Sequence, residues 1–345
     1  MDALLSPRRR SLLLSGLAGV AGLGAAGFGA GCARNDGRMR LAGATMGSTW
    51  SVRIAGWRGP EQAARDAVTA AFDRVVALMS SFDAGSELAR FNRHVSTAPF
   101  GFSPETLAVL ARAQQVSLLT AGAFDITVAP LVGAWGFGAG AAARGGAPDA
   151  AALAAQPLGW HRLVLEGRAA RKLDPHLTLD LSGIAKGHAV DQAALALEAL
   201  GVERYLVEAG GEIRTRGLNA EDRPWQVAIE KPDAWPQQVQ RIVPLQGASI
   251  ATSGDYRNFY ELDGRRVHHE IDPATRAPAA HALASVSVVH GECMAADALA
   301  TALYVMGPER GLAFAHEHKL AAHFIVREAA ALREIATPAL LELAA

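Results

Sequence analysis

The order of strand-like and helical segments constrains the fold of this chain more than any other feature of its sequence. Strand-like stretches at 178–181, 205–207, 225–229, 285–289 and 323–326 alternate with only two helical stretches, at about 184–200 and 295–306. Residues 259–262 and 265–269 are joined by Asp263-Gly264, a dipeptide that favours a hairpin turn. The order is not a regular βαβ alternation. The sequence therefore predicts an α+β protein of mixed, largely antiparallel sheets with packed helices, in one large two-lobed domain.

The composition excludes several classes of protein. Half of the 345 residues are hydrophobic, 19% are charged, and 33 Lys and Arg residues nearly balance 34 Asp and Glu residues. Such a chain can bury a sizeable core, and a net charge of −1 gives no general attraction to nucleic acid. Two cysteines, Cys32 and Cys293, are too few for a disulfide framework or a four-cysteine zinc site. We expect a globular protein with no nucleic acid partner.

The first 32 residues have the pattern of an export signal. Three arginines at 8–10 precede an apolar stretch, 12–30, which is rich in Ala and Gly and is followed by Gly31-Cys32. This ending resembles a bacterial lipobox, so we expect a lipid anchor at Cys32, with ordinary cleavage or an uncleaved anchor as alternatives. The arginines are also compatible with twin-arginine export. The functional domain is expected at 33–345, on an exported chain.

Two helices are expected in the first half of the domain. Ala, Val and Leu recur at helical spacing from Pro60 to about residue 82. Ser103 and Pro104 have the residue types of an N-cap and a first helical position, and this second helix should stop at Gly122. The Gly- and Ala-rich stretch at 136–155 predicts a loop.

The segment Asp180-Leu-Ser-Gly-Ile-Ala-Lys186 is a candidate phosphate site. A strand that feeds a helix through Ser182-Gly183 would present backbone N–H groups at the helix N-terminus, and these groups and the helix dipole favour an anion. Lys186 would add positive charge there. A plain strand-to-helix turn is the alternative.

Asp297 and Thr301 form a candidate cation site. They are four residues apart on an almost wholly apolar helix and therefore share one face. Carboxylate and hydroxyl oxygens suit a hard cation such as Mg²⁺. Alternatively, Asp297 acts as a charge near a helix N-terminus and Thr301 bonds back to the helix.

Histidines occur at two places of interest. His268-His269 at the end of a strand could supply a general base, orient a phosphate, or form a half-buried structural pair. His316-Glu317-His318, with His323, is interpreted as a solvated helix end rather than a metal site. Cys293 is expected to pack in the core.

Taken in order, these segments resemble the FAD:protein FMN transferase family, the ApbE family, from about Thr45 to Gly307. The resemblance rests on several short motifs. They are Thr45-Met-Gly-Ser-Thr-Trp50, Ser86-Glu-Leu-Ala-Arg-Phe-Asn92, Gly122-Ala-Phe-Asp-Ile-Thr-Val-Ala-Pro-Leu131 with Trp135-Gly-Phe-Gly138, Leu179-Asp-Leu-Ser-Gly-Ile-Ala-Lys-Gly187, Ala209-Gly-Gly211, Ala251-Thr-Ser-Gly-Asp-Tyr256, His268-His269 through Pro273, and Ala296-Asp-Ala-Leu-Ala-Thr-Ala-Leu303.

The resemblance implies an ApbE/T-fold-like architecture and an enzyme that splits FAD at its pyrophosphate. Such an enzyme transfers FMN to a Thr or Ser hydroxyl of an acceptor protein and releases AMP. Matching positions imply His269 as the catalytic histidine, and Mg²⁺ held by Asp297, Thr301 and the backbone carbonyl of Ala185, with Asp297 also counted as catalytic. The residues implied to line the FAD site, Lys186 among them as the phosphate-binding cation, are Met46, Phe82, Ala123, Phe124, Asp125, Ser182, Lys186, His188 and Ile271.

Five positions depart from the family pattern. Glu212 stands where Asp is usual, Arg276 where Gly is usual, and Phe82 and His188 where Tyr is common. Glu270 replaces an apolar residue beside His269 and places a carboxylate next to the candidate base.

Two other functions compete with flavin transfer. An Mg²⁺-dependent FAD pyrophosphatase would use the same residues with water as the acceptor. A non-catalytic, exported FAD-binding lipoprotein would need no pairing of a metal with a base. The expected location is the periplasmic face of the inner membrane, and the resemblance implies an acceptor that is a membrane-associated redox subunit or another exported flavoprotein.

Overall fold

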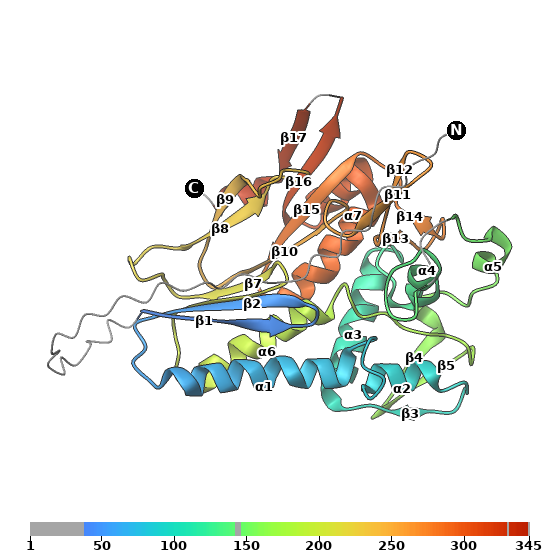
Figure 1. Cartoon of the computed structure of the whole chain (residues 1–345), viewed down its shortest axis with the longest axis horizontal. Coiled ribbons are helices and arrows are strands. Elements are labelled where there is room, and N and C mark those ends of the chain that lie inside the picture. Colours follow the sequence, from blue (N-terminus) through green and yellow to red (C-terminus); the bar gives the residue numbers. More distant parts are fainter. Residues whose placement is uncertain (1–37, 142–145, 330, 344–345) are drawn as a thin grey trace, which may run out of the picture. The chain divides into compact units, whose positions relative to one another are not determined.

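An antiparallel sheet of eight strands organises the molecule in a computed structural model that describes residues 38–141, 146–329 and 331–343 (Figure 1). In spatial order its strands are β1 (Arg38–Thr45), β2 (Ser48–Ala55), β6 (Tyr205–Ala209), β7 (Glu212–Arg216), β10 (Ser249–Gly254), β15 (Leu283–His290), β16 (Ala321–Glu328) and β17 (Ala331–Ala336). Every adjacent pair is antiparallel. The leader and the lipobox Cys32 lie outside the described residues, so their predictions stay open.

Three long helices cover one face of this sheet. They are α1 (Glu61–Met79), α6 (Ala185–Ala199) and α7 (Cys293–Glu317). Helix α6 packs on β6 and β7, α7 packs on β10 and β15, and α6 also contacts both α1 and α7. Within α7, Gly307 has a φ of 76°, and the helix is kinked there, just before Pro308. The predicted helices at 60–82, 184–200 and 295–306 are confirmed.

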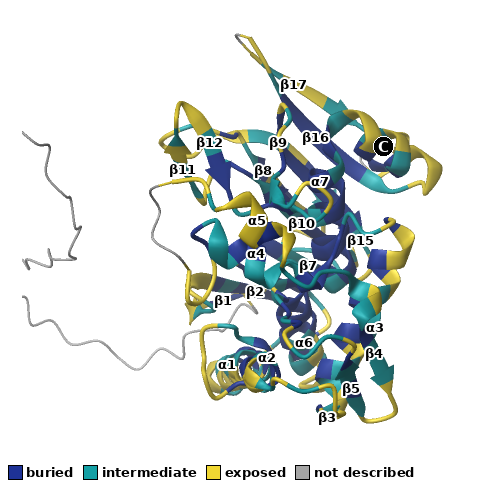
Figure 2. Ribbon diagram, turned by 90° about the vertical axis from the view of Figure 1, so that its right-hand side faces the viewer, coloured by how far each residue is buried: buried dark blue, intermediate teal, exposed yellow. Residues whose placement is uncertain are grey.

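A second hydrophobic cluster lies on the opposite face of the sheet. Tyr205 and Val207 belong to the core under the helices, whereas Leu206 between them belongs to the second cluster. Successive strand residues point to opposite faces, so the two clusters lie on either side of the sheet. The hairpin of β8 (Trp225–Glu230) and β9 (Val239–Leu245) and the short α8 (Pro338–Glu342) contribute to the second cluster. The central strands are accordingly buried on both faces (Figure 2).

Smaller elements lie beyond the main sheet. Strands β3 (Phe100–Gly101), β5 (Ala169–Lys172) and β4 (Leu163–Glu166) form a three-stranded sheet, and two-stranded pairs are made by β11 (Phe259–Leu262) with β12 (Arg265–His268) and by β13 (Ile271–Asp272) with β14 (Ala277–Pro278). The helical elements are α2 (Glu87–Arg93), α3 (Pro104–Leu119), η1 (Ile126–Val128), α4 (Ala129–Ala134), α5 (Ala150–Ala154) and η2 (Trp160–Arg162).

Local sequence signals explain several of these elements. The Ser103 side chain accepts a hydrogen bond from Thr106 N, which is the predicted cap of α3. Asp263 and Gly264 both have positive φ, 50° and 73°, as the predicted hairpin turn between β11 and β12 requires. The stretch 136–155 is mostly loop in its described part and ends in the short α5. The α+β prediction of one domain is confirmed for the described residues.

The predicted strand at 178–181 is wrong. This segment has no strand partner, because the side chain of Asn92 takes the place of one: Leu179 N donates to Asn92 Oδ1 at 2.8 Å, and Asn92 Nδ2 donates to Leu179 O at 2.8 Å. Asp180 N in turn donates to Ile126 O at 2.7 Å. The backbone of this extended segment is therefore satisfied by a side chain of α2 and by η1.

No helix among the described residues is both long and apolar enough to cross a membrane.

Candidate active site

The turn at Ser182–Ile184 and the start of α6 form one side of the site. Asp180 Oδ1 accepts hydrogen bonds from Ser182 N at 2.8 Å and from Ser182 Oγ at 2.5 Å, which fixes the turn. Gly183 packs against α7 so tightly that a Cβ there would lie 2.9 Å from Thr301 Oγ1 and 3.4 Å from the Phe124 ring. The glycine thus allows the turn and Thr301 to meet.

Asp297 and Thr301 face this turn from α7. Asp297 Oδ2 accepts a hydrogen bond from Gly187 N, in the first turn of α6, at 2.9 Å. Thr301 Oγ1 lies 3.2 Å from Ser253 Oγ of β10. Asp297 is only 4% exposed, and burial raises the pKa of its carboxyl, with Lys186 and the Gly187 bond opposing that shift. The predicted shared face is confirmed.

Lys186 reaches across the start of α6 to a buried carboxylate. Its Nζ forms an ion pair with Glu212 of β7, a side chain that is buried. Burial acts to lower the pKa of Lys186, but the charges of Glu212, Asp297 and Glu270 together raise it. The Lys186 stem runs past Gly210, whose Cβ position would lie 3.6 Å from Lys186 Cδ and 3.7 Å from Ser48 Cβ. The site therefore extends to the Gly210-Gly211 turn and the turn at Met46-Gly47.

His269 lies at the end of β12 and is partly exposed. Its Nδ1 lies 3.3 Å from the carbonyl oxygen of Asn258, so Nδ1 must carry the proton of that hydrogen bond. The neutral ring then presents Nε2 as its proton acceptor. Glu270 Oε1 lies 3.6 Å from this Nε2, and burial raises the pKa of Glu270 while the charges of His269 and Lys186 oppose the rise.

A cavity of about 550 Å³ lies next to Phe137 and Asp180. Its walls come from 81–93, 129–140 and 178–180, including Asn92, Pro130, Phe137 and Asp180. Phe137 lies between the cavity and His269, because its ring centroid is 6.2 Å from that of His269. Asp180 joins it to the Ser182 turn. Its size falls within the usual range for small-molecule sites.

Several residues implied for FAD binding lie at the edges of this arrangement. Ser81 lines the cavity, and its neighbour Phe82 is 73% exposed. Ile271 is buried in a small cluster with Val132 and Phe137, behind the cavity wall. Met46 has a φ of 49° in the β1–β2 turn and packs against the main core. Their contacts with FAD remain predictions.

Two implied FAD residues have structural partners. Asp125 accepts hydrogen bonds from Thr127 N, Thr127 Oγ1 and Trp160 N, and so holds the chain around Ala123 and Phe124. His188 Nε2 lies 3.1 Å from Glu105 Oε1, and Glu105 also pairs with Arg74. Asp125 therefore orders the chain that follows α3, and His188 links α6 to α3.

Two expectations need correction. The backbone N–H groups of Ser182, Ile184, Ala185 and Gly187 already have acceptors, so they are not available for a phosphate as predicted. Asp180 Oδ1 accepts from Ser182 N, the Leu181 carbonyl oxygen accepts from Ile184 N and Ala185 N, and Asp297 Oδ2 accepts from Gly187 N. His323 is not part of a solvated helix end: it is buried on β16 and its Nε2 lies 2.8 Å from Glu334 Oε2. Cys293 is buried, as predicted.

Sequence reasoning missed Ser253 and Asn92 as parts of the site. Ser253 contacts Thr301, and Asn92 anchors Leu179. Ser253 lay within a quoted motif, but nothing in its spacing indicated that β10 faces α7. The role of Asn92 could be found only from its contact with Leu179, which lies 87 positions away in the sequence.

The donor set fits a small hard cation. Asp297 supplies a carboxylate, Thr301 a hydroxyl, and Ala185 lies in the same turn of α6 as Gly187, which bonds Asp297. Among the described residues no group of three His, Cys, Asp or Glu side chains is placed to hold a metal. A site with one carboxylate suits Mg²⁺, which usually keeps several waters and binds substrate phosphates as well.

Known flavin transferases are similar to this chain in sequence and in fold. The chain is 41% identical to the FAD:protein FMN transferase of Vibrio cholerae over 311 residues, covering 89% of this chain and 93% of that protein. It is 35% identical to the Escherichia coli K12 protein of the same name, over 84% of each chain. The solved flavin transferase ApbE from Vibrio cholerae superimposes with a TM-score of 0.82 at 40% identity, over 88% of this chain and 98% of that one.

The Pseudomonas stutzeri flavinyl transferase ApbE, in its apo form, also superimposes with a TM-score of 0.82, at 36% identity over 89% of this chain and 96% of that one. Residues 46–324 match the ApbE family as a whole. The chain belongs to the ApbE family.

Proposed function

We propose that this protein transfers the FMN part of FAD to a Thr or Ser hydroxyl of an acceptor protein. The observation that supports the proposal is that Asp297 and Thr301 of α7 contact the start of α6 and β10, while Glu270, next to His269, lies close enough to Lys186 and Asp297 for their charges to interact. The family and its relatives named FAD:protein FMN transferase support the same reaction.

The chemistry is a displacement at phosphorus. The acceptor oxygen forms a bond to the FMN phosphorus, the bond to the bridging pyrophosphate oxygen breaks, and AMP leaves with that oxygen. Nε2 of His269 would take the proton from the acceptor hydroxyl, because Nδ1 is engaged with the Asn258 carbonyl oxygen. Lys186 contributes positive charge close to Asp297. When bound by Asp297, Thr301 and Ala185, Mg²⁺ would neutralise charge on the pyrophosphate.

The test is covalent transfer in solution. The purified protein is incubated with FAD, Mg²⁺ and a candidate acceptor, and flavin fluorescence is read on the denatured acceptor in a gel. We expect a fluorescent band that disappears with EDTA and with Thr301→Ala but survives in Thr301→Ser, which keeps the oxygen. Release of FMN and AMP without a band, across several acceptors, would indicate a pyrophosphatase instead. Intact FAD with tight binding would indicate a carrier.

We further propose that the chain is exported and anchored by lipid at Cys32, at the periplasmic face of the inner membrane, where the acceptor is a membrane-associated redox subunit. The basic and apolar leader with its lipobox-like ending supports this location. Metabolic labelling with a radioactive fatty acid should mark the protein and not its Cys32→Ala variant. Equal labelling of both would refute the anchor.

A further inference from the structure

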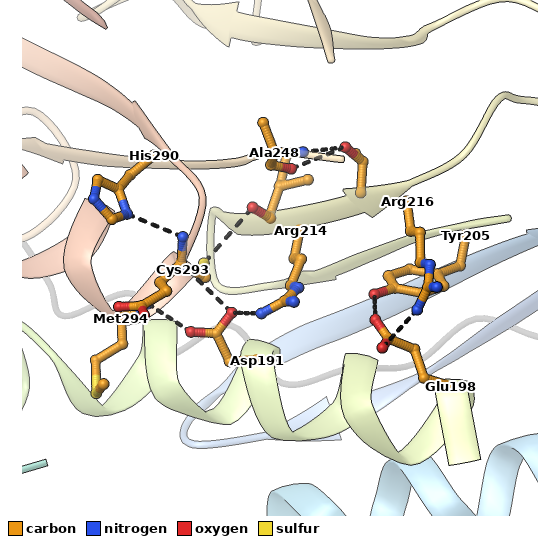
Figure 3. Close-up of polar contacts among 12 residues, drawn as sticks. Asp191, Glu198, Tyr205, Arg214, Arg216, Ala248, His290, Cys293 and Met294 are labelled. Atoms are coloured by element: carbon orange, nitrogen blue, oxygen red, sulfur yellow. Dashed lines mark hydrogen bonds and ion pairs between the residues drawn. The ribbon is translucent and has the colours of Figure 1, made fainter. Parts of the chain in front are cut away.

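Helices α6 and α7 cap each other's first turns. Asp297 of α7 accepts from Gly187 N of α6 at 2.9 Å. In the reverse direction, Asp191 of α6 accepts from Cys293 N at 3.0 Å and from Met294 N at 2.9 Å, the first two residues of α7 (Figure 3). Glu292, at the N-cap position of α7, makes no side-chain cap of its own. The α7 start is therefore capped by a carboxylate from another helix.

The two helices approach too closely for any side chain between them. A Cβ on Gly187 would lie 2.4 Å from the carbonyl oxygen of Cys293. Cys293 comes four residues, or about one helical turn, before Asp297, and Thr301 follows one turn later. A displacement of Cys293 from α6 thus displaces Asp297 and Thr301 from the α6 start as well.

Arg214 of β7 holds the capping carboxylate. Its Nη1 donates to Asp191 Oδ1 at 2.6 Å, and both side chains are largely buried. Asp191 Oδ1 therefore receives two hydrogen bonds and Oδ2 one, so the carboxylate is fixed between the sheet, α6 and α7. A carboxylate held in this way fixes the position of the first residues of α7.

We infer that Asp191 is a positioning residue for the cation site: by fixing the start of α7 on α6, it sets the separation between Asp297, Thr301 and the first turn of α6. The inference rests on the proposed function, because it takes those residues as the Mg²⁺ ligands. Asp191 is not a ligand itself, since its oxygens are already engaged by the α7 backbone and Arg214.

The same helix supplies a matched control. Glu198 lies two turns after Asp191 on α6 and pairs with Arg216 of β7 at 2.6 Å, as Asp191 pairs with Arg214. Glu198 also accepts from Tyr205 Oη at 2.5 Å (Figure 3). Both carboxylates link α6 to β7, but only Asp191 has hydrogen bonds to the start of α7 among the contacts in the described residues. Substitution of Glu198 therefore weakens packing without releasing α7.

The experiment measures binding of Mn²⁺ alone to the full-length protein, by the loss of the free Mn²⁺ resonance in electron paramagnetic spectra. We expect Asp191→Asn to weaken Mn²⁺ binding by about tenfold, the scale typical of residues that orient metal ligands, and Glu198→Gln to leave it unchanged. The Mg²⁺ concentration for half-maximal turnover should rise in parallel, with little change in the rate at saturating Mg²⁺.

Equal Mn²⁺ affinity in Asp191→Asn and the parent protein would overturn the inference, and so would equal weakening in both variants. A parent protein that binds no Mn²⁺ would remove the proposed cation site itself, a result distinct from the other two. If Asp191→Asn does not fold, as judged by circular dichroism, Arg214→Lys takes its place. Lysine keeps the charge but not the planar guanidinium geometry, so an intermediate loss of affinity is expected and unchanged affinity would refute the inference.

Discussion

Lys186 of α6 and Glu212 of β7 form an ion pair beside the Asp297 carboxylate, with Glu212 almost completely buried. Glu212 Oε2 has no hydrogen-bond partner among the described residues. This pair places one cation among three carboxylates, those of Glu212, Asp297 and Glu270. Lys186 is therefore the cation that compensates the negative charge of these three carboxylates.

Lys186→Met should destabilise the protein by about 1–3 kcal/mol, because it leaves the Glu212 charge buried without its cation. The double variant Lys186→Met/Glu212→Leu should recover much of the loss, since no buried charge then remains. Guanidinium unfolding of the parent, both single variants and the double variant measures this coupling. Strictly additive effects would show that the ion pair does not contribute to stability.

His269→Ala should lower the rate of FMN transfer by about 10²–10⁴-fold, the range usual for a general base, while FAD affinity changes little. The reason is that Nδ1 is held by the Asn258 carbonyl and only Nε2 is placed to accept a proton. Single-turnover transfer and FAD titration, done on the same preparation, separate the two effects. A parallel loss of rate and affinity would assign His269 to binding.

Asn92→Ala should cost about 1–3 kcal/mol of stability, because it removes both hydrogen bonds to the backbone of the buried Leu179. Asn92→Asp is the matched variant: its oxygen can still accept from Leu179 N, but it cannot donate to Leu179 O when ionised. It should fall between the parent and Asn92→Ala in urea unfolding. FAD affinity should follow the same order, since Asn92 and Leu179 line the cavity.

The contribution of three buried histidines to stability should fall as the pH drops from about 6.5 to about 4. Burial lowers the pKa of His268 from 6.5 to about 4 in the folded state, and burial also lowers the pKa of His281 and of His323. Between these pH values the three histidines bind more protons in the unfolded chain than in the folded chain, so their contribution favours unfolding in acid, whereas buried carboxyls with raised pKa values, such as Glu212 at about 7, oppose it.

The variant His268→Gln should flatten this dependence, because its side chain cannot take up a proton. Urea unfolding at closely spaced pH values provides the measurement, with the exposed His316→Gln as the control for loss of an imidazole. An unchanged slope in His268→Gln would contradict the assignment of this effect to His268.

Local patterns in the sequence predicted most of the elements near the site. Helix spacing located α6 and α7, the Asp263-Gly264 turn located the β11–β12 hairpin, and Ser103 located the start of α3. The i, i+4 relation of Asp297 and Thr301 predicted their common face. These signals succeed because the interactions behind them act within a few residues.

Contacts between distant residues were beyond such reasoning. The segment 178–181 alternates polar and apolar residues like a strand, and only the contact with Asn92 shows that it pairs with a side chain instead. The helix start at 182–187 has the pattern of an anion site, and only Asp297, 110 positions away from Gly187, shows that one of its donors is occupied. The sequence alone grouped His323 with His316 and His318 as a solvated cluster. Only its position on β16 shows that His323 is buried.

Arg276 has a φ of 59°, a conformation that glycine adopts at lower cost, and its Nη1 donates to the carbonyl oxygens of Leu153 at 2.5 Å and Gln156 at 3.0 Å. Its own carbonyl oxygen accepts from Trp135 Nε1 at 3.1 Å. Two loops that differ in sequence position by more than a hundred residues are thus joined through one side chain. Replacement of Arg276 by glycine would relieve the backbone but remove the hydrogen bonds that hold the segment around α5. The choice of residue at position 276 therefore depends on the segment around α5. We expect position 276 and that segment to vary together among related sequences.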